Sequence, residues 1–183
     1  MLRGRLSICR SEATSTKDAM SSQNLLLETK DEQQTEQLGF AIGRCLVPGM
    51  TLALDGELGA GKTRLTQAIA IGLDVPAGQV NSPTFTLCVP HAGRLALLHV
   101  DAYRIAQLEE VDELDLDEWV ETGGVLIVEW AQRISPALPP VDLEIEIETV
   151  SVYLTPCIIV LCSSTRSEEH TSELQSHSDL VCR

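Results

Sequence analysis

The residues best suited to chemistry form one glycine-rich stretch, Gly-Glu-Leu-Gly-Ala-Gly-Lys-Thr at residues 56–63. Glycines let the backbone curl so that successive N–H groups point at one anion, which is how proteins hold phosphate groups. Lys62 would reach the β- and γ-phosphates, and the Thr63 hydroxyl would bind Mg²⁺. The pattern therefore predicts a site for ATP and Mg²⁺. Its nucleotide-binding residues would be Gly59, Ala60, Gly61, Lys62 and Thr63.

The flanking segments have the character that this motif requires. Residues 50–54 are a short apolar run typical of a buried strand, and it leads directly into the glycines. After Lys62, apolar residues recur at helical spacing, at Leu65, Ala68, Ile69 and Leu73. A chance glycine turn would need neither neighbour. The order strand, loop, helix also places the positive end of a helix dipole beside the phosphates.

Two acidic residues follow short apolar runs further along the chain. Asp101 ends the run 95–100, and Glu129 ends the run 125–128. In an open α/β sheet, groups at the carboxyl ends of strands face the ligand crevice, and Mg²⁺ prefers oxygen ligands. A strand-end carboxylate can instead cap a neighbouring helix. The pattern leaves open which of the two acids would touch the metal.

The segment Asn-Ser-Pro-Thr-Phe-Thr at residues 81–86 contains hydroxyl groups that could sense the γ-phosphate, as switch segments do. A plain Ser-Pro turn is an equally good interpretation of the same residues. Trp130, beside Glu129, is typical of core or interface filling. Arg104 and Arg133 could offset charge in a phosphoryl-transfer transition state, although surface arginines are common.

The periodicities predict an α/β protein with a three-layer P-loop NTPase fold, a mainly parallel central sheet and an antiparallel edge strand. A helix is expected over 31–46 because its apolar residues recur at i, i+3, i+4 and i+7. Residues 109–120 are acidic and helix-like. Strict alternation over 143–148 predicts a strand with one face in water, and we expect this last strand at the edge.

The chain of 183 residues is long enough for one domain with extensions. We expect a disordered extension at 1–25, with Met20 as a possible start, a P-loop ATPase domain at 26–149 and an atypical tail at 150–183. From Ser163 onward the tail shows no periodicity and no pairing strand. It resembles a translated adapter, and we assign it no function.

Composition excludes several classes of protein. Thirteen basic and 27 acidic residues give a net charge of −14, which disfavours tight nonspecific contact with RNA or DNA. No apolar run reaches the length of about 20 residues that spans a bilayer. The six cysteines lack metal-ligand spacing, which favours thiols in a reducing compartment. We expect a cytoplasmic protein that does not bind membranes.

Four motifs in this order resemble the TsaE family, the ATPase subunit of the bacterial tRNA threonylcarbamoyladenosine machinery. They are the glycine-rich stretch, Ser-Pro-Thr-Phe-Thr-Leu at 82–87, His-Val-Asp-Ala-Tyr-Arg at 99–104 and Val-Glu-Trp at 128–130. The resemblance covers about 31–148. It implies that Thr63 and Glu129 bind Mg²⁺ and that residues 59–63 hold the ATP phosphates. It also implies catalytic roles for Lys62, for Asp101 as the Walker-B-like acid and for Thr84 as part of a switch.

The resemblance further implies the partners TsaD and TsaB, which transfer a threonylcarbamoyl group to an adenosine of certain tRNAs. ATP hydrolysis would occur only in their complex and would reset it between turnovers. The tRNA would then contact this chain only indirectly, which agrees with the acidic surface. Ala102 stands where the family usually has Leu, and the usual C-terminal segment is replaced by the tail.

Two other functions fit a P-loop. A small-molecule kinase would need an acceptor-binding region and an arginine-bearing lid, yet only four arginines follow Thr63 before residue 148: Arg64, Arg94, Arg104 and Arg133. A nucleotide-gated interaction module would bind ATP without hydrolysing it. A GTPase is disfavoured because no Asn-Lys-x-Asp stretch is present for guanine.

Overall fold

The computed structural model describes residues 7–9, 23–80, 87–152 and 155–164. Its strands are β1 (Ser7–Cys9), β2 (Gln23–Thr29), β3 (Thr51–Gly56), β4 (Cys88–His91), β5 (Leu97–Asp101), β6 (Val125–Glu129), β7 (Leu143–Val152) and β8 (Thr155–Ser164). Its α-helices are α1 (Glu32–Cys45), α2 (Lys62–Gly72), α3 (Glu109–Asp112) and α4 (Leu116–Glu121). Three short 3₁₀ turns, η1 (Ala102–Arg104), η2 (Ala131–Arg133) and η3 (Ser135–Ala137), complete the fold.

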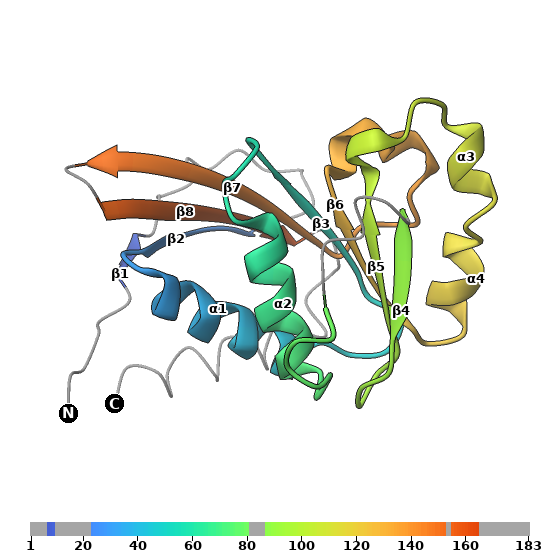
Figure 1. Ribbon diagram of the computed structural model, residues 1–183, viewed down its shortest axis with the longest axis horizontal. Coiled ribbons are helices and arrows are strands. Elements are labelled where there is room, and N and C mark those ends of the chain that lie inside the picture. The colour runs from blue at the N-terminus through green and yellow to red at the C-terminus, as the bar shows by residue number, and fades with distance from the viewer. Residues whose placement is uncertain (1–6, 10–22, 81–86, 153–154, 165–183) are drawn as a thin grey trace, which may run out of the picture.

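One sheet of eight strands runs through the described part of the molecule in the order β1-β2-β8-β7-β3-β6-β5-β4. The four central strands, β7, β3, β6 and β5, are parallel, and antiparallel strands flank them on both sides (Figure 1). This arrangement confirms the mainly parallel α/β sheet predicted from the alternation of strands and helices. It brings the carboxyl ends of β3, β6 and β5 to one edge, where ligands bind in such sheets.

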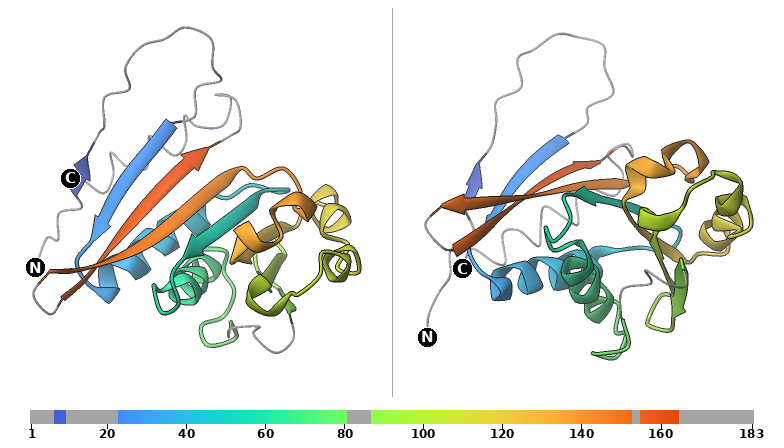
Figure 2. Two further views of the ribbon diagram at one scale, coloured as in Figure 1. Left: turned by 90° about the horizontal axis from the view of Figure 1, so that it is seen from above. Right: turned by 45° about the horizontal axis from the view of Figure 1, so that its top comes forward.

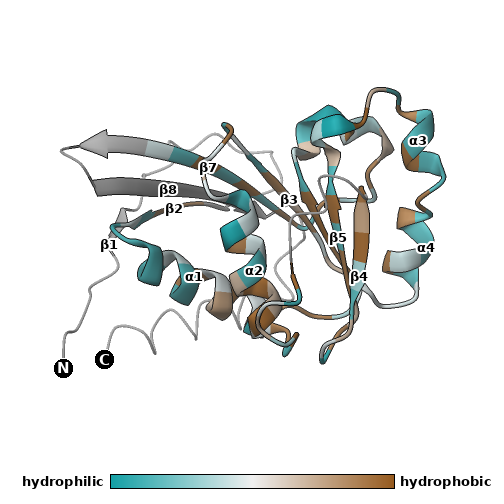
Figure 3. Cartoon of the chain, viewed as in Figure 1, coloured by the Kyte–Doolittle hydropathy of each residue, from teal (hydrophilic) through white to brown (hydrophobic). Residues whose placement is uncertain are grey.

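Helices cover the two faces of the sheet unequally. The helices α1 and α2 lie on one face, over a core that includes Leu52, Leu54, Ile145 and Ile147. The smaller elements α3, α4, η1 and η2 cover the other face beyond β3 (Figures 1 and 2). Hydropathy follows this layering, since apolar residues line β3, β5 and β6 while the outer surfaces of α1 and α3 are polar (Figure 3). The molecule is therefore three-layered over β3, β6 and β5, whereas the second face of β7 is exposed.

The strand at 143–148 was expected at an edge, and this placement is wrong. The strand β7 pairs with β3 on one side, where Leu143 lies opposite Leu52, and with β8 on the other side. It is therefore an interior strand. Its alternation has another cause. Ile145 and Ile147 are buried under the helices, whereas Glu144 and Glu146 are exposed on the opposite sheet face. The pattern correctly reported a half-covered face, but a half-covered face is not confined to edge strands.

The sheet also continues past the domain limits expected from the sequence. The limit at residue 149 falls inside β7, and β8 pairs antiparallel with both β7 and β2. Ser163 and Ser164 belong to β8, so the expectation that no pairing strand begins there is wrong for these two residues. The strand β2 begins at Gln23, within the segment expected as an extension. Residues 165–183 lie outside the described part of the chain.

Helices α1 and α2 approach each other through glycines. A Cβ at Gly43 would overlap the carbonyl oxygen of Ile69 and lie 2.9 Å from the Cα of Gly72. A Cβ added at Gly39 would likewise lie too close to the Cβ of Ala68, at 2.5 Å. The short contact distance lets α1 fix the position of α2, whose first turn carries the predicted phosphate-binding residues.

We predict that Gly43→Ala lowers the free energy of unfolding by about 1–3 kcal/mol, because the added methyl group meets backbone that cannot yield. Alanine is otherwise the better helix former by about 1 kcal/mol, so a net loss would isolate the packing effect. Urea unfolding measures it. The control Gln37→Ala changes an exposed position of the same helix and should leave stability within about 0.5 kcal/mol. Equal stability of the two variants would contradict the packing argument.

Candidate functional site

The glycine-rich stretch joins the end of β3 to the start of α2. Gly61 is the residue before the helix and adopts a φ of 104°, which favours glycine, and no side chain caps the first turn. The N–H groups at this helix end are consequently left for a ligand. Glycine is required at residue 56 for a different reason: a Cβ at Gly56 would overlap the carbonyl oxygen of Ile147 on β7. The loop thus has the local geometry that the sequence predicted.

Lys62 is folded back onto its own loop. Its Nζ donates to the carbonyl oxygens of Gly56 and Glu57 at 2.7 and 2.8 Å, and only 5% of the residue is exposed. Burial lowers the pKa of Lys62, while the negative charges of Glu129, Asp55 and Asp101 oppose this shift in that order. A cation held by two carbonyl groups beside a helix N-terminus can turn toward a phosphate anion.

Glu129 is the best-anchored acid of the site. It is 2% exposed at the end of β6, and its Oε2 accepts a hydrogen bond of 2.8 Å from the Thr63 hydroxyl. Its Oε1 lies 2.8 Å from His99 Nε2 on β5 and 3.3 Å from the Thr66 hydroxyl on α2. A buried carboxylate needs such partners, since an isolated buried charge is very costly. The register of β3 beside β6, which pairs Leu54 with Glu129, places this acid next to the glycine-rich loop.

Asp101 lies one strand further from the loop. It pairs in register with Glu129 and is 5% exposed. Its Oδ1 accepts a hydrogen bond of 3.0 Å from the backbone N–H of Tyr103, so it caps the short turn η1. The capping role that the sequence left open for a strand-end acid is therefore present at Asp101, and Thr63 contacts Glu129 instead. Asp101 still contributes negative charge near Lys62.

The residues present fit a magnesium ion that is completed by other ligands. The Thr63 hydroxyl and the Glu129 carboxylate bring two oxygen donors within 2.8 Å of each other. Among the described residues, no group of three or more His, Cys, Asp or Glu side chains could hold a metal by itself. Mg²⁺ commonly takes one or two protein oxygens and completes its octahedron with waters and phosphates, so this sparse donor set suits it.

Two aromatic rings border Lys62. The Trp130 ring centroid lies 3.7 Å from Lys62 Nζ and 5.0 Å from the Tyr103 ring centroid. Trp130 has a φ of 60°, an uncommon conformation for a large side chain that often marks functional sites. Core or interface filling was expected for Trp130, and the residue does pack against the smaller core cluster, while its ring also lies beside Lys62 Nζ. The sequence signal that could have indicated this contact is its position directly after Glu129.

Thr84, Arg104 and Arg133 are the remaining candidate residues from the sequence. Thr84 and the rest of the proposed switch, residues 81–86, lie outside the described residues. Arg133 lies near the site, with its guanidinium carbon 6.0 Å from the Tyr103 ring centroid, and Arg104 ends the turn η1. Two residues that the sequence analysis did not assign, His99 and Thr66, both contact Glu129. His99 was visible in the motif at 99–104, but only the strand register shows that it reaches Glu129.

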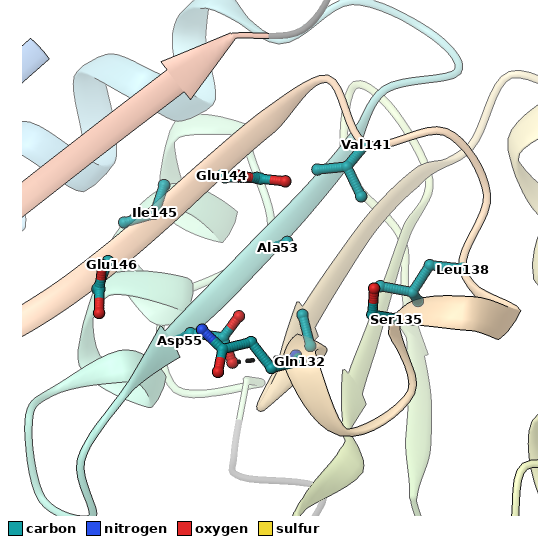
Figure 4. Close-up of a pocket in the computed structure, with 10 residues that line it drawn as sticks. Ala53, Asp55, Gln132, Ser135, Leu138, Val141, Glu144, Ile145 and Glu146 are labelled. Atoms are coloured by element: carbon teal, nitrogen blue, oxygen red, sulfur yellow. Dashed lines mark hydrogen bonds between the residues drawn. The ribbon is translucent and has the colours of Figure 1, made fainter. Parts of the chain in front are cut away.

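A hollow of about 290 Å³ lies on the other sheet face, between β3, β7 and the turns η2 and η3 (Figure 4). Asp55, Glu144 and Glu146 line it together with apolar side chains. Asp55 accepts a hydrogen bond of 3.2 Å from the backbone N–H of Gln132. Burial raises the pKa of Asp55 above its ordinary value, and the nearby glutamates add to this effect while Gln132 and Lys62 oppose it.

A family model described as threonylcarbamoyl adenosine biosynthesis protein TsaE matches residues 29–153. This chain belongs to the TsaE family. The match includes the glycine-rich loop, Asp101 and Glu129, and it continues a few residues past the limit of 149 expected for the domain.

Individual TsaE relatives agree with this assignment. The tRNA threonylcarbamoyladenosine biosynthesis protein TsaE of Treponema pallidum (strain Nichols) is 36% identical over 123 residues, which cover 67% of this chain and 90% of the relative. The protein of the same name from Bacillus subtilis (strain 168) is 40% identical over 121 residues, covering 66% of this chain and 75% of the relative. The crystal structure of YdiB from Bacillus subtilis superposes with a TM-score of 0.70 at 31% identity, covering 87% of this chain and 99% of that one. The solved structure supports the predicted P-loop fold.

The helices carry one further piece of information. Along the ranges that the structure describes, every helix is too short or too polar to cross a lipid bilayer.

We predict that Asp55→Asn raises the free energy of unfolding at pH 7 relative to the wild type. The raised pKa means that ionised Asp55 is disfavoured in the folded state, so its contribution to stability is greatest below pH 3.8 and is lost as the pH rises through the folded-state pKa. The advantage of the variant should therefore shrink toward pH 3.8. Asparagine keeps an oxygen to accept from Gln132. Urea unfolding across this pH range measures the difference.

Glu148→Gln serves as the control, since Glu148 is an exposed acid on the neighbouring strand β7. Its effect should be small at every pH. A destabilised Asp55→Asn variant at pH 7, or one whose advantage grows toward acid pH, would contradict the stated origin of the pKa shift.

Proposed function

We propose that this protein binds ATP with Mg²⁺ in the 59–63 loop and hydrolyses it as a subunit of the tRNA threonylcarbamoyladenosine machinery. TsaD and TsaB would be its partners in the cytoplasm, and hydrolysis would reset their complex between turnovers. The relatives are named for threonylcarbamoyladenosine biosynthesis. The nucleotide chemistry is our inference from the site.

One observation carries this proposal: a buried lysine, an uncapped helix N-terminus and a threonine–glutamate pair meet at one glycine loop. Lys62 supplies positive charge, the first turn of α2 supplies N–H groups, and Thr63 with Glu129 supplies oxygen ligands. These are the three requirements of a magnesium-bound triphosphate. Bound Mg²⁺ would neutralise charge on the β- and γ-phosphates, with Thr63 and Glu129 as its protein ligands.

Partner dependence is supported by what surrounds the loop. Leu58 at the tip of the loop is 77% exposed, and Tyr103 beside Trp130 is 42% exposed. Apolar groups at the rim of a site are suited to cover by another protein, which would exclude water from the phosphates. Asp101 and Thr84 are the further residues that we propose for the hydrolytic step. The net charge of −14 favours contact with tRNA through the partners.

A small-molecule kinase is the second candidate, and the arginines argue against it. Arg94 donates to the carbonyl oxygens of Gly43 and Leu46, at the end of α1. Arg64 pairs with Glu32 and Glu36 on the same helix. Both therefore hold α1 in place, and Arg133 donates to the carbonyl oxygen of Ile105, so these three arginines already have structural roles. A non-hydrolysing module shares the binding site and differs only in turnover.

We predict that Lys62→Ala lowers the affinity for Mg²⁺–ATP by at least about 10-fold, because a charge-assisted contact to phosphate is worth about 1.5–3 kcal/mol. The fold should persist. Burial lowers the pKa of Lys62, which means that the charged side chain is less favourable in the folded protein than in water, so its removal does not cost the fold a stabilising charge. Isothermal titration calorimetry measures the affinity. The matched control is Arg64→Ala. Arg64 is also a cation in the first turn of α2, but it lies at the surface and pairs with Glu32 and Glu36, so this variant should bind ATP as the wild type does. Unchanged affinity in Lys62→Ala would remove the proposed phosphate site.

We predict that ATP turnover is slow for the isolated protein and rises when TsaD and TsaB are added together. Phosphate release, measured with each component alone and with all three, provides the test. Phosphate transferred to an added nucleoside or sugar would instead support a kinase. ATP binding with no turnover in either condition would support the non-hydrolysing module and contradict the ATPase proposal.

A further inference from the structure

We infer that His99 is a positioning residue for the metal site, because it holds Glu129 in the orientation that presents one carboxylate oxygen to Thr63. This inference rests on the proposed binding of Mg²⁺–ATP. His99 is fully buried, and its Nε2 hydrogen bond goes to Glu129 and not to the glycine-rich loop.

The two oxygens of Glu129 have different surroundings. Oε1 is turned away from the loop, with His99 Nε2 at 2.8 Å and the Thr66 hydroxyl at 3.3 Å. Oε2 faces the loop and accepts from the Thr63 hydroxyl at 2.8 Å. Of the two contacts that hold Oε1, the one from the His99 imidazole is shorter than the one from the Thr66 hydroxyl. With Oε1 held, Oε2 is left for the metal that Thr63 would share.

The backbone makes His99 a rigid donor. It lies in the middle of β5, is 0% exposed, and pairs in register with Ile127 of β6. Glu129 is two residues beyond Ile127, so the two side chains point to the same sheet face. The 2.8 Å separation is that of a hydrogen bond, and a deprotonated carboxylate has only acceptor atoms, so the pair forms when Nε2 carries the hydrogen. Because both strands are central, this donor cannot move without disturbing the sheet.

A second buried histidine provides a comparison. His91 lies on the neighbouring strand β4 and is 8% exposed, and burial together with His99 lowers its pKa. Within the described ranges, its Nε2 has no hydrogen-bond partner and it does not contact Glu129. Substituting His91 therefore changes a buried imidazole without removing a donor from the carboxylate.

The test compares His99→Leu, His99→Gln and His91→Leu in the full chain. Leucine removes the donor, whereas the glutamine amide can donate to Glu129 from a similar position. ATP affinity is measured by calorimetry with EDTA and over a Mg²⁺ titration. Donors to metal ligands typically affect metal affinity about 10–100-fold. Mg²⁺ should raise the affinity for ATP above its value in EDTA. We expect the Mg²⁺ concentration that gives half of this increase to be about 10–100-fold higher for His99→Leu than for the wild type. His99→Gln and His91→Leu should stay close to the wild type, and affinity in EDTA should be equal in all four proteins.

The readouts separate positioning from general damage. A loss of ATP affinity in EDTA that matches the loss with Mg²⁺ would show that His99 supports the fold of the loop, and would overturn the inference. Equal losses in His99→Leu and His99→Gln, or in His99→Leu and His91→Leu, would also overturn it. If the wild type itself gained no ATP affinity from Mg²⁺, the proposed function would fail before any variant was compared.

Discussion

A buried carboxylate organises the centre of this molecule. Glu129 is 2% exposed at the end of β6, and hydroxyl and imidazole groups from two other elements supply the hydrogen-bond partners that a buried carboxylate needs. Thr63 and Thr66 come from α2, and His99 comes from β5. The carboxylate therefore joins the helix that begins at the glycine-rich loop to the strand that ends at Asp101. The sheet order β3-β6-β5 follows the same requirement, since β6 must lie between the loop and His99.

The position of α2 depends in turn on α1, through close glycine contacts rather than through interlocking large side chains. Gly43 and Gly72 bring the two backbones together, and Arg94 binds the carbonyl groups at the end of α1. On the outer side, Arg64 pairs with Glu32 and Glu36. Exposed pairs of this kind contribute about 0–1 kcal/mol each, so the helix contact is set mainly by backbone fit. The glycine-rich loop is thus supported from both sides, by a glycine contact between helices and by a buried hydrogen-bond network.

Much of this architecture could be predicted from the sequence because it is periodic or local. The helix at 31–46, the strand before the loop, the helix after Lys62 and the strands ending at Asp101 and Glu129 all have clear patterns, and the loop is a motif with its own mechanism. What could not be predicted depends on which strands lie side by side. The sequence gives Asp101 and Glu129 the same local signal, but the pairing of Leu54 with Glu129 separates a capping acid from one beside Thr63. Likewise, strict alternation at 143–148 revealed a half-covered strand and could not show that β8 lies beyond it.

The central claim is that Thr63 and Glu129 share a metal over a triphosphate held by the 59–63 loop. A crystal structure with Mg²⁺ and a non-hydrolysable ATP analogue tests it most directly. The account predicts the phosphates over the N–H groups at the start of α2, with Lys62 released from the carbonyl groups of Gly56 and Glu57. It also predicts Mg²⁺ bound to the Thr63 hydroxyl and to Glu129, directly or through water. A nucleotide bound away from this loop, or a metal held by Asp101 without Thr63, would contradict it.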